Sequence, residues 1–166
     1  QAAPDTETIP PLSAPVRWLN LLSMALAVGS VSFAVCVACA PGLLRKQERR
    51  MRRLMGIGWA LVGIAGFALL LYQAMQVTDA PLPAALSSVG AILSGTRFGM
   101  LWIGRMIVWI VFGIAVWRRR YGIALAAGAI ILLLHSFYSH ASATYDLIPA
   151  VVGDWLHLTA TAFWVG

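Results

Sequence analysis

The sequence predicts an all-α fold, a polytopic transmembrane helix bundle with four full spans and a truncated fifth. Of the 166 residues, 60% are hydrophobic and only 11% are charged, and the mean hydropathy is +0.82. A soluble domain is about 45–50% apolar and about 25% charged. The apolar residues also form runs of roughly 20, the length that crosses about 30 Å of hydrocarbon. Two cysteines are too few for a disulfide scaffold.

Five apolar segments are predicted as helices, over residues 16–40, 54–77, 98–117, 121–143 and 151–166. The last would be about 24 Å long as a helix, short of a full crossing, so we expect this chain to be a fragment cut within a fifth span. Residues 83–96 are weakly apolar and too short to span, which favours a surface helix. Residues 1–15 are polar and rich in proline and predict an extended linker outside the transmembrane domain of residues 16–166.

The basic residues predict the orientation of the bundle. Most of them lie in two predicted loops that fall on the same side: Arg45, Lys46, Arg49, Arg50, Arg52 and Arg53 in the first, and Arg118, Arg119 and Arg120 in the second. The positive-inside rule makes this side cytoplasmic, so the N-terminus lies on the outer side. Short basic loops between apolar runs indicate a lipid bilayer as the surroundings and no nucleic acid as partner, although the pI is about 10.2.

All three histidines lie in the last two predicted helices, which a short loop makes an antiparallel pair. The helical rise puts His140 about 5 Å and His157 about 9 Å below the outer boundary, so the two rings would share one metal ion. His135 is a further candidate ligand, and Asp154 would orient the ring of His157 from one turn away. Imidazole suits copper, zinc, iron and nickel. The alternative is that these histidines only form hydrogen bonds between helices.

Four more residues are candidates for the site or for a path through the membrane. Met100 opens the third span, where its thioether would favour Cu(I), or else it fills a gap in the core. Arg105, about 11 Å deep, is a functional residue or forms a structural ion pair with Asp154. Cys36 and Cys39, near the cytoplasmic end of the first span, would form a metal relay, or else they pack as small apolar residues.

Several short motifs resemble the copper resistance D family, the CopD-type inner-membrane proteins. The resemblance covers roughly residues 90 to 166, whereas the first two helices match only in layout. It rests on Thr96 to Gly99 followed by Arg105, on Ser139-His140-Ala141, on Asp154 to His157, and on the ending Ala162 to Gly166. It implies a multi-pass protein of the bacterial inner membrane with a periplasmic N-terminus and further helices beyond Gly166. It also implies a periplasmic CopC-type copper-binding protein or domain as partner, and it supports His140 and His157 as ligands.

The function that these observations predict is copper transport and resistance, with copper as the transported ion and no enzymatic activity. Two alternatives differ in class. One is a b-type haem protein of membrane electron transfer, in which His135 and His157 hold the iron from two neighbouring helices. The other is a membrane scaffold whose histidines are structural.

Overall fold

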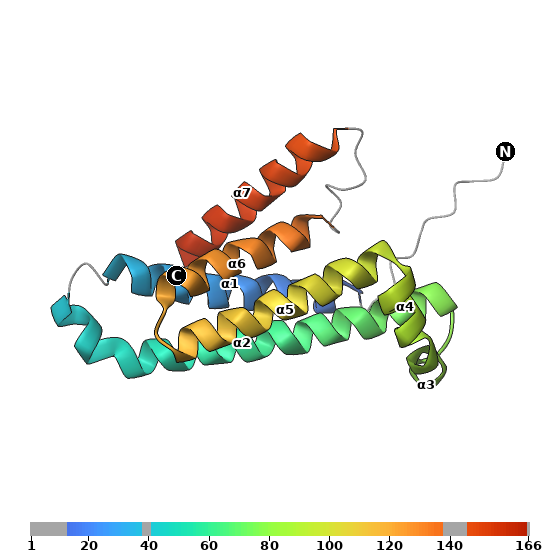
Figure 1. The fold of residues 1–166 in the computed structure, drawn as a ribbon, viewed down its shortest axis with the longest axis horizontal. Helices are drawn as coiled ribbons and strands as arrows, with labels where there is room; N and C mark the ends of the chain where they lie inside the picture. Colours follow the sequence, from blue (N-terminus) through green and yellow to red (C-terminus); the bar gives the residue numbers. More distant parts are fainter. Residues whose placement is uncertain (1–12, 38–40, 138–145, 166) are drawn as a thin grey trace.

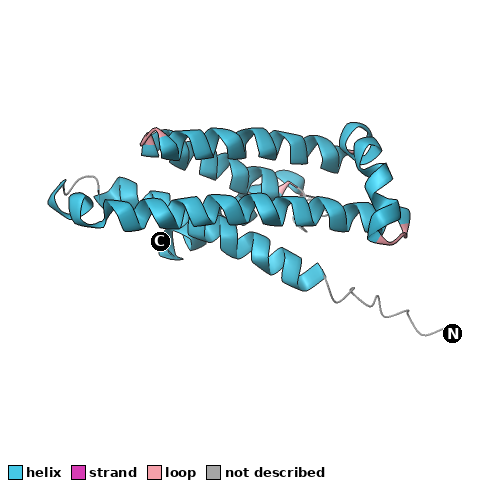
Figure 2. Cartoon of the chain, turned by 90° about the horizontal axis from the view of Figure 1, so that it is seen from below, coloured by secondary structure: helices cyan, strands magenta, loops and turns pink. Residues whose placement is uncertain are grey.

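The computed structural model describes residues 13–37, 41–137 and 146–165, and in these ranges the chain is helical, without a strand (Figures 1 and 2). The predicted all-α class is therefore confirmed. The elements, in chain order, are α1 (Ser13–Val37), α2 (Pro41–Thr78), α3 (Leu82–Ala85), the 3-10 turn η1 (Leu86–Ser88), α4 (Val89–Gly95), α5 (Arg97–Trp117), α6 (Tyr121–Ser136) and α7 (Leu147–Val165).

The long helices pack side by side, with α1 in contact with α2, α6 and α7, and with α5 in contact with α2 and α6 (Figure 1). The main core lies between α1, α2, α5 and α6. Its most buried side chains include Met24, Val31, Met55 and Phe112, each at most 1% exposed. In Figure 1, α7 leans away from α6 toward the end where α7 begins.

The surface of the bundle suits hydrocarbon. Large apolar side chains on α5 are exposed at Ile103, Ile107, Ile110 and Ile114, a spacing of three and four that forms one stripe. Three helical segments are long and apolar enough to cross a membrane: Ala14–Cys36, Glu48–Thr78 and Arg97–Trp117. The 16 described residues of α6 measure about 24 Å and the 19 of α7 about 28 Å. The length criterion thus supports three spans, and four full spans with a truncated fifth remain a prediction.

The first and last helices begin three and four residues earlier than predicted. Helix α1 begins at Ser13 and α7 at Leu147, with Pro15 and Pro149 in their first turns. Proline is tolerated there because the N–H groups of the first turn have no partner within the helix. Residues 13–15, predicted as the end of the linker, and residues 147–150, predicted as loop, therefore belong to helices. The predicted end of the fourth span lies in residues 138–143, outside the described residues.

The prediction of a basic loop before the second span is wrong, because α2 already begins at Pro41 and includes the basic residues of 45–53. Proline is favoured at the first position of a helix, and the Leu, Arg, Lys, Gln, Glu and Met residues that follow are strong helix formers. With 38 residues, α2 is about 57 Å long. It therefore extends well beyond the thickness of the hydrocarbon layer.

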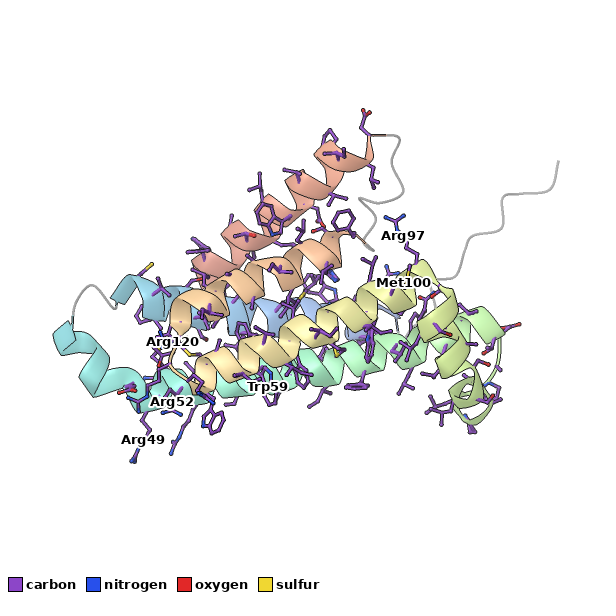
Figure 3. All side chains as sticks on the ribbon, viewed as in Figure 1. Arg49, Arg52, Trp59, Arg97, Met100 and Arg120 are labelled. Carbon is purple, nitrogen blue, oxygen red and sulfur yellow. The ribbon has the colours of Figure 1, made fainter. Side chains whose placement is uncertain are left out.

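Both basic clusters nevertheless lie at one end of the bundle, as predicted. A carboxylate oxygen of Glu48 in α2 lies 3.0 Å from a guanidinium nitrogen of Arg119 in the turn between α5 and α6. Figure 3 shows Arg49, Arg52 and Arg120 at this same end. We call it the basic end. The positive-inside rule assigns it to the cytoplasm, and this assignment remains a prediction.

At the opposite end, the predicted surface helix of residues 83–96 is helical but broken into α3, η1 and α4. Ala85 and Ile92 are buried in a small cluster with Ala74 of α2. The Thr96 hydroxyl oxygen accepts a hydrogen bond of 2.9 Å from the backbone N–H of Gly99, which caps the start of α5. This segment therefore folds onto the ends of α2 and α5.

Two tryptophans join α2 and α5 halfway along the bundle. The indole rings of Trp59 and Trp109 stack with their centroids 4.6 Å apart. The Trp59 Nε1 donates to the Trp109 carbonyl over 3.1 Å, and the Trp109 Nε1 donates to the Trp59 carbonyl over 2.8 Å. A Cβ atom at Gly63 would lie 2.6 Å from the Trp109 ring, and one at Gly113 would lie 2.5 Å from the Trp59 ring. Glycine at these positions lets the indoles lie flat between the helices.

Candidate functional site

Three polar side chains, two of them fully buried and one half-buried, join α5, α1 and α6. Arg105 and Asn20 are each 0% exposed, and an Arg105 guanidinium nitrogen donates to the Asn20 Oδ1 over 2.5 Å. The Asn20 Nδ2 lies 3.4 Å from the Nδ1 of His135. Because polar groups inside a membrane protein are costly, such a cluster marks a functional or a structurally essential position.

The helical repeat places these side chains in the interior. On α1, Asn20 shares its face with the buried residues Met24, Ala27 and Val31, at spacings of four, seven and eleven. On α5, Arg105 lies between the buried Trp102 and Phe112, at spacings of three and seven. Each polar group is therefore fixed by the same packing that forms the core around it.

Charged groups on three helices influence His135. Arg105 of α5, Asp154 of α7 and Arg17 of α1 all act on the imidazole electrostatically. Arg17 lies one turn before Asn20 on α1, so both can face the same neighbour. Two cationic side chains and one carboxylate therefore influence this ring.

Helix α7 is attached to α6 through Trp155, whose Nε1 donates to the Ala129 carbonyl over 2.9 Å. Asp154, the preceding residue, is half-buried, whereas His157 is exposed. Counted from Leu147, His157 lies about 15 Å along the helix axis. Its distance from the start of α7 is therefore greater than the 9 Å predicted from a helix that begins at Val151.

The comparison with known families explains the resemblance seen in the sequence. The model of a family described as copper resistance protein D-like, N-terminal domain, matches residues 8–148. The chain belongs to this copper resistance protein D-like family. No curated protein and no solved structure matches the chain.

The family match differs in extent from the resemblance predicted from the sequence. The matched residues include α1 and α2. From the sequence, these two helices of the copper resistance protein D-like chain were expected to resemble the family only in the order of their apolar segments. His140 and Arg105 lie within the matched residues. Asp154 and His157 lie beyond them.

The other predicted site residues of this copper resistance D-like chain are placed as follows. Met100 is 65% exposed near the start of α5, and Figure 3 shows it close to Arg97, at the end away from the basic cluster. Cys36 is exposed near the end of α1. His140 and Cys39 lie outside the described residues. Within the described ranges, no three His, Cys, Asp or Glu side chains group closely enough to hold a metal ion.

Asn20 is the residue of the cluster that the sequence predictions did not include. A single amide within an otherwise apolar helix was the available signal, because polar side chains are rare in membrane spans. The predicted partner of Arg105 was Asp154. The structure shows a hydrogen bond from Arg105 to Asn20, and the ion pair with Asp154 remains a prediction.

Proposed function

We propose that this chain belongs to a protein that carries copper ions across the bacterial inner membrane, with its N-terminus in the periplasm. Membership of the copper resistance protein D-like family supports the choice of metal. The position of His157 supports the choice of site, since an ionisable side chain within a membrane helix is costly and is a functional position by default. Such a protein needs no catalytic step. A periplasmic CopC-type protein would deliver the ion.

In this proposal, His140 and His157 supply imidazole ligands in succession to copper arriving from the end of the bundle opposite the basic end. The carboxylate of Asp154, one turn before His157, adds the negative charge that attracts a cation. Met100 would offer a thioether at the same end of the bundle. Cys36 lies near the end of α1 at the basic end, where it and Cys39 would pass Cu(I) to a soluble carrier.

The haem alternative fits this arrangement less well. The hydrogen bond from Trp155 to the Ala129 carbonyl shows which part of α7 lies beside which part of α6. His135 lies six residues, or about 9 Å, from Ala129 toward the end of α6, whereas His157 lies about 3 Å beyond Trp155 in the opposite direction. Two haem ligands would face each other across about 4 Å. Counted this way, the two residues lie about 12 Å apart along the bundle, further than one haem iron would bridge.

The test of the proposed function is the copper content of cells that produce the full-length protein. We expect His140→Ala with His157→Ala to abolish the change in cellular copper that the unaltered protein causes. Ile148→Ala, at an exposed position in the first turn of α7, is the control and should leave the change intact. Equal copper in cells with the double variant and with the unaltered protein would refute the assignment. A Soret band in the purified protein would favour haem.

A further inference from the structure

The hydrogen bonds that join Arg105, Asn20 and His135 determine which nitrogen of the His135 ring carries its proton. A guanidinium has N–H donors and no acceptor. The side-chain oxygen of Asn20 must therefore face Arg105, as the structure shows. The amide –NH2 group of Asn20 is then directed at the imidazole, 3.4 Å from its Nδ1.

An amide –NH2 group also only donates, so the Nδ1 of His135 must accept. A neutral imidazole carries one proton, and with Nδ1 as the acceptor this proton resides on Nε2. The opposite tautomer would place an N–H group against the Asn20 –NH2 group. Turning the amide over would relieve that contact only by placing the –NH2 group against the guanidinium of Arg105.

A metal ion binds a neutral imidazole through a nitrogen lone pair. In His135, the Nδ1 lone pair is directed at Asn20, and Nε2 carries the proton. We propose that Arg105 and Asn20 are positioning residues that hold His135 as an Nε2–H donor and thereby keep it out of the copper ligand set. The copper part of this inference rests on the proposed function, whereas the tautomer rests on the hydrogen bonds alone.

The charges near the ring support the same conclusion. Arg105 and Arg17 both act on His135 electrostatically, against the single carboxylate of Asp154. Their combined positive charge opposes a cation at this ring. His157 lies on the exposed side of α7, one turn from that carboxylate. In this proposal the two histidines differ in role: His135 offers an Nε2–H donor, and His157 is the ring left available for the ion.

Asn20→Asp is the variant that reverses the tautomer, because the two side chains have nearly the same shape. A carboxylate accepts hydrogen bonds from both neighbours, from Arg105 and from the ring. The Nδ1 of His135 would then carry the proton, and the Nε2 lone pair would be able to bind a metal. This variant should therefore add His135 to the copper ligands.

The experiment is nitrogen NMR of the full-length protein with ¹⁵N-labelled histidine, without copper, with the His135 signals assigned from their loss in His135→Gln. We expect the Nε2–H tautomer in the unaltered protein and the Nδ1–H tautomer in Asn20→Asp. Should Asn20→Asp fail to fold, Arg105→Met serves instead, because the released amide should allow both tautomers. An Nδ1–H signal in the unaltered protein, or signals that neither variant changes, would overturn the proposal.

Cu(I) titration against a competing chelator provides the second measurement. We expect His135→Gln to keep the copper stoichiometry of the unaltered protein, His157→Gln to lose bound copper, and Asn20→Asp to bind Cu(I) more tightly. Loss of bound copper in His135→Gln would overturn the exclusion of His135. If the unaltered protein bound no copper, the proposed function would fail, and the NMR result would still decide the tautomer.

Discussion

Replacing Arg105 by methionine tests whether the buried polar side chains stabilise the fold as a unit. The change removes the donor to the Asn20 Oδ1 and leaves that oxygen buried, since both residues are 0% exposed. A buried acceptor without its donor costs about 1–3 kcal/mol. Hydrogen bonds between membrane helices contribute about 0.6 kcal/mol on average and about 1.7 kcal/mol at most. Because a guanidinium is the donor, we expect the hydrogen bond between Arg105 and Asn20 to contribute an energy near that upper limit, about 1.5 kcal/mol.

A double-mutant cycle isolates this energy. Arg105→Met and Asn20→Leu should each lower the free energy of unfolding. The double variant should lose about 1.5 kcal/mol less than the sum of the two, because it leaves neither partner of this bond unsatisfied. The measurement is equilibrium unfolding in mixed micelles, followed by circular dichroism.

Ser32→Ala provides the control for the cycle. Its hydroxyl is bonded to the Val28 carbonyl on the same helix, and it lies about 18 Å along α1 from Asn20. Its effect should add to that of Arg105→Met within about 0.5 kcal/mol. Equally additive effects of Arg105→Met and Asn20→Leu would refute the reasoning. So would unchanged folding and activity of Arg105→Ala, which would leave this arginine neither a structural nor a functional role.

Two further predictions concern the packing of α2 against α5 and the orientation of the bundle. Gly113→Ala should destabilise the protein by about 1–3 kcal/mol in the same unfolding assay, because its Cβ would lie 2.5 Å from the Trp59 ring. Gly104→Ala is the control and should leave the stability unchanged, because its Cβ would meet nothing within 4 Å. Equal effects of the two variants would contradict the packing of α2 against α5. In a chain without its native cysteines, Ser87→Cys should react with a membrane-impermeant maleimide added to intact cells, and Arg119→Cys should not; the reverse pattern would invert the orientation.

The helical fold follows from the sequence because apolar runs of membrane length have few alternatives. Backbone N–H and C=O groups in hydrocarbon must bond within the segment itself, which a helix achieves. Helix starts were harder to predict. Pro15 and Pro149 resemble breaks in a sequence, yet each lies within the first turn of its helix. The charge of the basic residues before Leu54 predicts a loop, whereas their helix propensity agrees with their place in α2.

The cluster around Arg105 was only partly predictable. The depth of the arginine indicated that it needs a partner, and the nearest acidic residue in the predicted topology was Asp154. The observed partner, Asn20, comes from the first helix, 85 positions away in the sequence. Such a pairing depends on how the helices are arranged around one another, which periodicity along a single helix does not determine. Likewise, His157 lies further from the start of its helix than predicted, because α7 begins at Leu147.

The central claim is that imidazoles of this chain hold copper inside the membrane. X-ray absorption at the copper edge of the Cu(I)-loaded, full-length protein tests it most directly. We expect the scattering of coordinated imidazole in the unaltered protein and in His135→Gln, and its loss in His140→Ala with His157→Ala. A spectrum with sulfur ligands alone, or one that the double variant leaves unchanged, would contradict the claim.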